Sequence, residues 1–274
     1  MSGPTTRSIL VTGAAGGLGA AIAAAAGADG YRVALLDVDR SVVETAAGIP
    51  GATGFVCSTT SVADVNSVLD QFGTPDAVVN NAGIVRFGPL LDQTLDQWRS
   101  VVEVNLTGTF TVAQAVARRL VAEGRCGAMV NITSMNGVMP GPNAGAYGST
   151  KSAVALLTKQ MAVEWGPLGL RVNAVAPGLI DAGMSGPIYA DPHIRALREA
   201  RVPLGRLGRS DDISRAVLWL LSDASEYITG EEILVDGGVT ISVIAGLPRP
   251  QSVDAVGVKP EMASGNSDTM KGAH

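Results

Sequence analysis

The chain has 274 residues, a length that suits one large domain or two small ones. Hydrophobic residues make up 46% of the chain and charged residues only 16%, so we expect a large core and much buried surface. The net charge of −5 argues against a surface for nucleic acid or for an anionic membrane, because both require clustered lysine and arginine.

Short β-branched runs alternate along the chain with longer helical patterns. Because the strand-like runs are apolar on both faces, they predict a parallel sheet covered by helices. Right-handed crossovers then leave an α/β fold, a doubly wound (Rossmann) parallel sheet of about seven strands with helices on both faces. Strands are expected at 8–12, 32–37, 52–57, 76–83, 127–134, 170–178 and 231–238, and helices at 18–30, 62–72, 95–124, 147–166 and 210–223. The last helix has Ser210 or Asp211 as its candidate N-cap.

The domain organisation follows from composition. No internal repeat and no break in composition occurs before about residue 240, so residues 1–240 are predicted to form a single domain. Residues 241–274 are rich in Pro, Gly, Ser and isolated charges, and such a segment buries little surface. We expect 241–250 to contact a neighbouring copy of the chain, where the segment could cover that copy's pocket, and disorder beyond about residue 255; a tail that is loose throughout is the alternative.

Cysteines and histidines are few. Cys57 and Cys126 lie in separate apolar stretches and are interpreted as small buried hydrophobic residues in a reducing compartment. The histidines are His193 and His274, and no spacing resembles a metal site. The run 9–28 loosely imitates a secretory signal, but its five glycines fit a strand, turn and helix. No apolar, Gly-poor stretch reaches the roughly 18 residues of a membrane span, and a cytoplasmic location is expected.

A glycine-rich segment, VTGAAGGLGAA (11–21), follows the first expected strand and opens the first helix. Its glycines permit a tight turn and the close approach of a ligand, while the free N–H groups of the helix favour a pyrophosphate. A turn that needs glycine only for packing would give a similar run. The strand before it and the helix after it favour dinucleotide binding.

The second expected strand ends in Asp37, 18 residues after Gly19. A carboxylate there accepts hydrogen bonds from the adenosine ribose and repels a 2′-phosphate. Neither the glycine loop nor Val38 supplies a cation for such a phosphate, so NAD is favoured over NADP. The alternative is that Asp37 only caps the strand end, and Arg40 could turn toward a phosphate.

Tyr147 and Lys151 stand four residues apart in AYGSTK (146–151), so they share one face of a helix. A free tyrosine has a pKa near 10 and is a poor base at neutral pH. The ammonium group of Lys151, together with an oxidised nicotinamide, would favour the phenolate. A pKa of about 7 would need about 4 kcal/mol of preferential stabilisation, which requires a partly dry site. The alternatives are a packing tyrosine and a solvated lysine.

With the glycine loop, NNAG, NITS and YGSTK in this order, residues 7–238 resemble a short-chain dehydrogenase/reductase of the compact single-domain type. The family pattern T-G-x-x-x-G-x-G matches Thr12, Gly13, Gly17 and Gly19. The pattern N-N-A-G matches 80–83, and Y-x-x-x-K matches Tyr147 and Lys151.

The resemblance implies four catalytic residues, Asn105, Ser134, Tyr147 and Lys151. In this scheme Ser134 stabilises charge on the substrate oxygen, Lys151 also holds the nicotinamide ribose, and Asn105 helps conduct protons through water. Taken alone, Ser134 could be a strand-end cap, Asn105 a helix-interior polar group, and Asn80 and Asn81 turn formers. The candidate cofactor-binding residues are Gly13, Gly16, Gly17, Leu18, Gly19, Asp37, Val38, Ser58, Asn81, Ala82, Gly83, Tyr147, Lys151, Pro177, Gly178 and Ile180.

The chain departs from the family pattern at two positions. Ser58 stands where the family often has an aspartate beside the adenine, and Ala182 where it often has a threonine that reaches the nicotinamide amide. Hydroxyl or backbone groups at Ser58, and backbone groups of Ile180 or Ala182, would have to serve instead. Both changes put the anchoring of the cofactor in question.

The substrate pocket is expected between 135–146 and 179–208, the second of which has the Gly and Pro content of a lid. Its expected lining is apolar, with one added polar group. Arg195, Arg198 and Arg201 are interpreted as a solvated helix face rather than as a site for an acidic substrate. The candidate lining residues are Met135, Met139, Asn143, Met184, Ile188 and Tyr189.

Together these features predict an oxidoreductase that transfers a hydride between NAD(H) and a secondary alcohol or ketone, with Tyr147 as general acid/base. An NADP-dependent 3-ketoacyl-thioester reductase is the nearest alternative. A nucleotide-sensing module without catalysis is a second alternative, since fold alone never proves chemistry. The partners implied are a small-molecule substrate and other copies of the chain in a homotetramer, with neither nucleic acid nor membrane.

Overall fold

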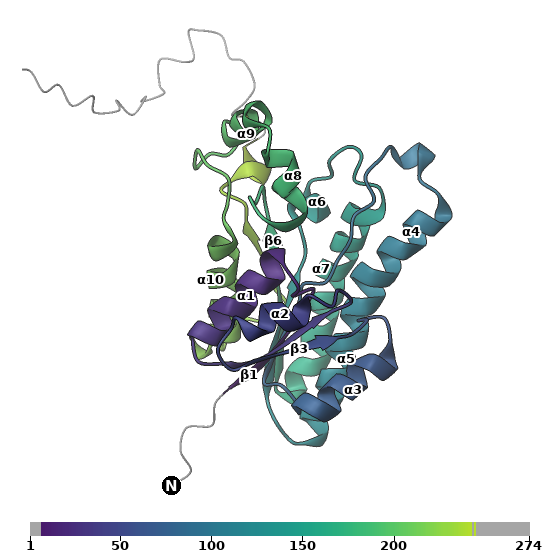
Figure 1. The fold of residues 1–274 in the computed structure, drawn as a ribbon, viewed down its shortest axis with the longest axis vertical. Helices are drawn as coiled ribbons and strands as arrows, with labels where there is room; N and C mark the ends of the chain where they lie inside the picture. Colours follow the sequence, from purple (N-terminus) through teal and green to yellow (C-terminus); the bar gives the residue numbers. More distant parts are fainter. Residues whose placement is uncertain (1–6, 243, 245–274) are drawn as a thin grey trace, which may run out of the picture.

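A computed structural model describes residues 7–242 and residue 244. Its centre is a seven-stranded sheet in the order β3-β2-β1-β4-β5-β6-β7, and each neighbouring pair is parallel (Figure 1). The doubly wound parallel sheet predicted from the sequence is therefore confirmed. The strands are β1 (Ser8–Thr12), β2 (Arg32–Asp37), β3 (Ala52–Val56), β4 (Ala77–Asn80), β5 (Gly127–Ile132), β6 (Leu170–Pro177) and β7 (Glu232–Val235).

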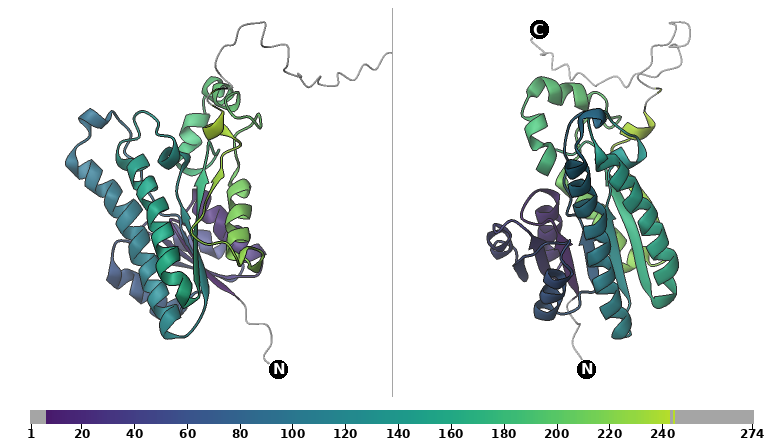
Figure 2. Two further views of the ribbon diagram at one scale, coloured as in Figure 1. Left: turned by 180° about the vertical axis from the view of Figure 1, so that it is seen from behind. Right: turned by 90° about the vertical axis from the view of Figure 1, so that its right-hand side faces the viewer.

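Helices cover both faces of the sheet (Figures 1 and 2). One face carries α1 (Gly17–Ala28), α2 (Val42–Ala47) and α10 (Ser210–Leu221), and the other carries α3 (Val62–Phe72), α5 (Gly108–Ala122) and α7 (Ala146–Trp165), with α4 (Leu95–Val102) against α7. The remaining helices are α6 (Met135–Val138), α8 (Gly186–Tyr189), α9 (Pro192–Glu199), a π-helical turn (Glu103–Thr107), and the 3₁₀ turns Leu90–Asp92, Gly166–Leu168, Gly183–Ser185, Asp223–Ser225 and Val239–Ile241.

Strand β1 shows why both faces must be covered. Ile9 and Val11 point into the core under α1 and α10, whereas Leu10 points into the core under α3 and α5. All three side chains are completely buried. Successive side chains of a strand face opposite sides of the sheet, so a strand that is apolar throughout needs a helix layer on each side.

The structure differs from the sequence-based elements at several places. The region 95–124 is not one helix, because the π-helical turn Glu103–Thr107 separates α4 from α5. Helix α10 begins at Ser210 after Arg209 as N-cap, so neither Ser210 nor Asp211 is the cap; the Asp212 carboxylate accepts the Arg209 N–H instead (2.7 Å). Cys126 is exposed rather than buried, since it lies in the turn before β5 and packs beside Gly169.

No helix within 7–242 combines the length and the apolar character needed to cross a membrane. The expectations for contact over 241–250 and for disorder beyond residue 255 fall almost wholly outside the described residues.

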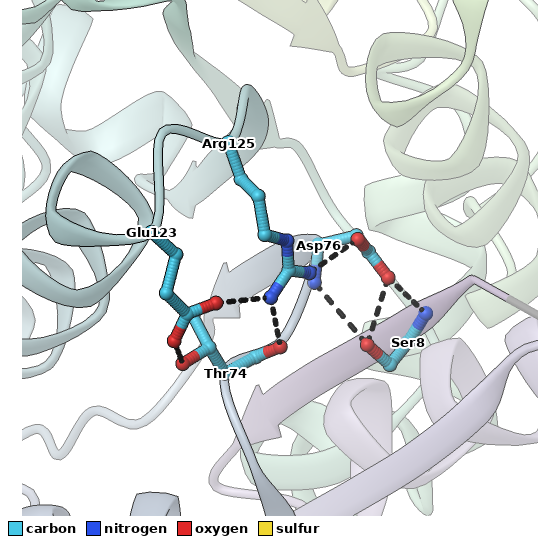
Figure 3. A network of polar contacts seen from close by, with 5 residues as sticks. All are labelled: Ser8, Thr74, Asp76, Glu123 and Arg125. Atoms are coloured by element: carbon cyan, nitrogen blue, oxygen red, sulfur yellow. Dashed lines mark hydrogen bonds and ion pairs between the residues drawn. The ribbon is translucent and has the colours of Figure 1, made fainter.

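A polar cluster ties together the amino ends of three neighbouring strands (Figure 3). Asp76, just before β4, accepts hydrogen bonds from the Ser8 N–H (2.7 Å) and hydroxyl (2.8 Å) at the start of β1. Its other oxygen pairs with Arg125 (2.6 Å), just before β5, and Arg125 also donates to Glu123 (2.6 Å) and to the Thr74 carbonyl (3.2 Å). Burial raises the pKa of Asp76, but the hydrogen bonds from Ser8 and Arg125 outweigh it, and the net pKa is lowered.

We expect Asp76→Asn to lower the free energy of unfolding by about 1–2 kcal/mol at pH 7, because a neutral amide loses the charge-assisted bonds of a partly exposed carboxylate. Since the folded-state pKa is depressed, the stabilisation by Asp76 is complete above its unfolded pKa and is lost as pH falls through the folded pKa. Urea unfolding at pH 7 and at acidic pH measures both effects. The control is Asp70→Asn, whose ion pair with Arg119 is 71% exposed on the Asp70 side and whose loss should change stability by less than about 0.5 kcal/mol. Equal losses from the two variants would contradict the assignment.

Candidate active site

The carboxyl ends of the parallel strands all lie at the same end of the sheet, below α6, α8 and α9 in the view of Figure 1. A cleft of about 740 Å³ lies at this end, where open α/β sheets bind ligands. Of the candidate site residues, only Gly19 and Asn105 do not line it. Those that do are Gly13, Gly16, Gly17, Leu18, Asp37, Val38, Ser58, Asn81, Ala82, Gly83, Ser134, Tyr147, Lys151, Pro177, Gly178 and Ile180.

The glycine loop is fixed by the loop that follows β4. Thr12 Oγ1 accepts the N–H groups of Asn81 and Ala82, each at 3.0 Å, and Asn81 Nδ2 donates back to the carbonyls of Thr12 and Gly13, also at 3.0 Å. Asn81 is thus more than a turn former. A Cβ on Gly19 would lie 2.1 Å from the Gly13 carbonyl, so Gly19 supports the loop from behind rather than facing the cleft.

The start of α1 has the features that a pyrophosphate requires. Its N-cap, Gly16, offers no side-chain acceptor, and the first turn contains no acidic residue. The space over Gly16 is open, because an added Cβ there would meet nothing within 4 Å. Gly17 has a φ of +58°, in the left-handed region that favours glycine. Free N–H groups at an uncapped helix start therefore face an open cradle, which fits the diphosphate of a dinucleotide.

Asp37 lies at the end of β2, on the wall of the cleft. Its carboxylate accepts the N–H groups of Ala15 and Asp39, each at 3.0 Å, so it does cap the strand end. Each carboxylate oxygen has a second lone pair, which leaves acceptors free toward the cleft. Ser58, on the same wall, is held by Thr60 (Oγ to Oγ1, 2.9 Å) and by Asp64, whose carboxylate accepts the Ser58 N–H at 3.3 Å.

Tyr147 and Lys151 come from the first turns of α7. Ser134 lies two residues after β5 and is the N-cap of α6, where its Oγ accepts the Asn136 N–H at 3.2 Å. The Lys151 Nζ atom lies 5.6 Å from the centre of the Tyr147 ring and donates to the Ile132 carbonyl at 2.7 Å. Burial lowers the pKa of Lys151 from 10.5 to about 8. Burial also raises the pKa of Tyr147, while hydrogen bonding with Ser134 lowers it to a smaller extent. Within the protein alone, the pKa of Tyr147 is therefore raised and not lowered as expected, because dehydration of the phenolate dominates.

Asn105 sits in the π-helical turn between α4 and α5 and is completely buried. Its Oδ1 accepts the Ile84 N–H (2.8 Å), and its Nδ2 donates to the Ile84 carbonyl (3.0 Å) and to Thr150 Oγ1 (3.1 Å). The amide thereby joins the loop after β4 to α7 one residue before Lys151. The extra residue of a π turn places this side chain where a regular helix would not, and such turns are frequent at functional sites.

The substrate half of the cleft differs in part from the sequence-based expectation. Met135, Met184, Ile188 and Tyr189 line it, but Met139 and Asn143 do not. Sequence reasoning missed the loop after β4, which contributes Ile84, Val85 and Phe87; its position directly after NNAG was an available signal. It also placed Arg198 on a solvated face, whereas Arg198 lines the cleft. Within the described part of the chain, no three His, Cys, Asp or Glu side chains gather as a metal site would require.

Comparison with known proteins gives a consistent result. Residues 13–240 match the family model described as enoyl-(acyl carrier protein) reductase. The chain is 34% identical over 245 residues to 3β-hydroxysteroid dehydrogenase 1 of Eggerthella lenta, covering 86% of this chain and 94% of that protein. It is 35% identical over 241 residues to the 3-oxoacyl-[acyl-carrier-protein] reductase FabG of Thermotoga maritima, covering 85% and 97%.

A solved structure agrees with these relatives. It is a candidate 2-deoxy-D-gluconate 3-dehydrogenase of Agrobacterium tumefaciens with bound NADP, 35% identical, with a TM-score of 0.80 and coverage of 88% of this chain and 100% of that one. The sequence motifs, the sheet order and these relatives point to one family of enzymes that use a nicotinamide cofactor. The chain belongs to the short-chain dehydrogenase/reductase family of oxidoreductases.

Proposed function

We propose that the protein transfers a hydride between NAD(H) and a secondary alcohol or ketone, with Tyr147 as the general acid/base. The observation that carries this proposal is the grouping of Tyr147, Ser134 and Lys151 in the same cleft as the uncapped start of α1. One end of the cleft suits a diphosphate, and the other holds a phenol, a hydroxyl and an ammonium group. That combination serves proton transfer beside a bound dinucleotide.

The chain's own groups have distinct tasks in this mechanism. When bound, the nicotinamide supplies or accepts the hydride. Ser134 donates a hydrogen bond to the substrate oxygen and stabilises the charge that develops there. Tyr147 gives its proton to that oxygen during reduction and takes it back during oxidation. Lys151 stabilises the phenolate that Tyr147 forms when it gives up this proton. Asn105 joins the loop after β4 to α7, the helix that carries Tyr147 and Lys151.

NAD is proposed as the cofactor because of the charges around the adenosine end of the cleft. Among the described residues that line the cleft, Asp37 carries the only carboxylate. The cationic residues among them are Lys151 and Arg198, which come from α7 and α9 rather than from the β2 side. Arg40 does not line the cleft. A 2′-phosphate at Asp37 would meet repulsion with no compensating cation.

We expect Asp37→Ser to raise the ratio of kcat/KM for NADPH to that for NADH by about tenfold, equivalent to about 1.4 kcal/mol, because a 2′-phosphate would no longer meet a carboxylate there. Steady-state kinetics with both reduced cofactors measures this ratio. Asp39→Ser is the matched control: it removes the same charge two residues away, at an exposed position that does not line the cleft. A wild-type enzyme that already prefers NADPH would contradict the NAD proposal.

An NADP-dependent 3-ketoacyl-thioester reductase remains the second candidate, favoured by the similarity to the Thermotoga reductase and by the NADP in the Agrobacterium structure. A panel of secondary alcohols, ketones and acetoacetyl thioesters, followed by absorbance with NADH and with NADPH, separates the two. Turnover of simple ketones with NADH supports the first proposal. Turnover confined to the thioester with NADPH supports the second, and tight cofactor binding without any turnover would contradict both.

We also propose a cytoplasmic homotetramer. Helices α5 and α7 expose apolar side chains that another copy could cover, among them Phe110 (40% exposed), Leu156 (68%) and Val163 (77%). Exposed apolar side chains on neighbouring helices are typical of surfaces that become buried when subunits associate. Light scattering coupled to gel filtration measures the assembly directly.

A further inference from the structure

Arg198 is a cation in the substrate half of the cleft with no anionic partner among the described residues. It comes from α9, is half-buried and lines the cleft. Its guanidinium carbon lies 5.5 Å from the centre of the Tyr189 ring, and Tyr189 is itself buried at 4% exposure in the same wall. A guanidinium stacked on an aromatic face is held in one orientation without using its N–H donors.

The neighbouring arginine on α9 is arranged differently. Arg195 pairs with Asp181 (2.7 Å) and with Glu199 (3.1 Å). These two ion pairs involve Asp181 and Glu199, and the third carboxylate of 179–208, Asp191, caps α9 by accepting the N–H groups of His193 and Ile194. None of the three pairs with Arg198. Within the lid (residues 179–208), Arg195 is thus paired with two carboxylates, whereas Arg198 lines the cleft.

The charges on this half of the cleft are all positive. Asp37 lies at the end of β2, whereas Ser134 and the lid follow β5 and β6, on the other side of β1 in the sheet. Lys151 lies on α7 at 4% exposure, so Arg198 is the cation that the lid contributes to the lining of the cleft. Apart from Ser185, the lid side chains that line the cleft with it are apolar, among them Met184, Ile188 and Tyr189. An apolar wall with one guanidinium suits a carbon skeleton that ends in an anion.

We propose that the substrate is a secondary alcohol or ketone that carries a carboxylate, and that Arg198 binds this carboxylate through its paired N–H groups. The inference rests on the proposed function for the reacting end and adds the chemistry of the distal end. A planar guanidinium forms two parallel hydrogen bonds to a carboxylate, and Tyr189 holds the guanidinium in place for that contact. The carboxylate would fix the distance between the reacting carbon and the lid, and so select substrates by length.

The test compares acids with their uncharged amides. 3-Hydroxybutyrate, 4-hydroxypentanoate and 5-hydroxyhexanoate place a secondary alcohol at three distances from a carboxylate, and each has a primary amide of nearly the same shape. We expect the wild-type kcat/KM for the best acid to exceed that for its amide by about 10- to 100-fold. Arg198→Gln should reduce this acid-to-amide ratio to near 1, and Arg198→Lys should restore it in part, because lysine keeps the charge without the planar fork.

Arg201→Gln is the matched control, since Arg201 is exposed three residues further on and does not line the cleft. It should keep the wild-type acid-to-amide ratio, which separates a direct contact from a general change in charge. An equal ratio for acid and amide in the wild-type protein, or a ratio that Arg198→Gln leaves intact, would overturn the inference.

A binding measurement keeps this inference separate from the proposed catalysis. Isothermal titration of the NAD⁺-loaded Tyr147→Phe protein with each hydroxy acid and its amide reports affinity without turnover. If no alcohol is oxidised by the wild type but the acids bind in an Arg198-dependent way, the anion site stands and the proposed reaction fails. If alcohols are oxidised without any preference for the acid, the reaction stands and the anion site fails.

Discussion

Replacing Tyr147 by phenylalanine is expected to lower kcat by about 100- to 10,000-fold, the range that a positioned general acid/base contributes. The substitution removes one hydroxyl and keeps the ring that lines the cleft. Affinity for NADH should change by less than about threefold, because the glycine loop and the start of α1 are untouched. Stopped-flow absorbance gives the rate, and quenching of tryptophan fluorescence gives the affinity.

The raised pKa of Tyr147 gives ketone reduction and alcohol oxidation different pH dependences. Burial raises the pKa of Tyr147, so the phenol is protonated at neutral pH and is ready to donate to a ketone oxygen. Alcohol oxidation needs the phenolate, and its rate in the wild type should rise as pH increases toward that pKa. In Tyr147→Phe this rise should disappear together with the activity.

Tyr227→Phe is the matched control, because the same hydroxyl is removed from a side chain that is 100% exposed. It should keep wild-type kcat and the wild-type pH profile. A Tyr147→Phe protein with more than about a tenth of wild-type kcat would require another proton donor and would remove the basis of the proposed mechanism.

The sequence predicted the fold well because its strands are apolar on both faces. Runs such as SILVT at 8–12 need a helix layer on each side, and right-handed crossovers leave few arrangements. It did not predict the π-helical turn Glu103–Thr107, whose side-chain contacts are with residues distant in the chain: Asn105 bonds both backbone groups of Ile84, 21 residues away. Helix propensity over 95–124 depends on the local residues alone, so it gives no information about that contact.

The candidate site shows the same division. Motif spacing located Tyr147, Lys151 and the glycine loop, and the family resemblance located Ser134. Gly13, Gly16 and Gly17 of the loop line one cleft together with Tyr147, Lys151 and Ser134. The pKa of Tyr147 was harder to predict from the sequence. An ammonium group four residues away, on Lys151, suggests a lowered pKa for the phenol. The pKa is raised instead, because Tyr147 is buried, and the sequence does not show that burial. Arg198 was misplaced for a related reason: three arginines along 195–201 resemble a solvated face until the ion pairs of Arg195 are known.

Lys151→Met is expected to separate stability from activity. Lys151 is 4% exposed, and burial lowers its pKa from 10.5 to about 8. At 1.36 kcal/mol per pKa unit, holding this ammonium inside the folded protein costs about 3 kcal/mol at pH 7. Methionine fills a similar volume without the charge, and the lost bond to the Ile132 carbonyl costs about 1–2 kcal/mol. We therefore expect the variant to be more stable by about 1–2 kcal/mol at pH 7.

The same substitution should lower kcat by about 10- to 1,000-fold, because a positive charge beside the phenolate changes the pKa of the phenol by about 1–3 units.

The pH dependence of stability tests whether the buried charge of Lys151 is the cause of the difference in stability. Between pH 8 and 10.5 the unfolded chain binds the Lys151 proton and the folded chain has released it, so wild-type stability rises with pH and the advantage of the variant shrinks. Lys159→Met, on the exposed part of the same helix, should show neither effect. Urea unfolding at pH 7, 9 and 10.5 measures the trend, and a variant that is less stable than wild type at pH 7 would contradict the predicted cost of burying the Lys151 ammonium group.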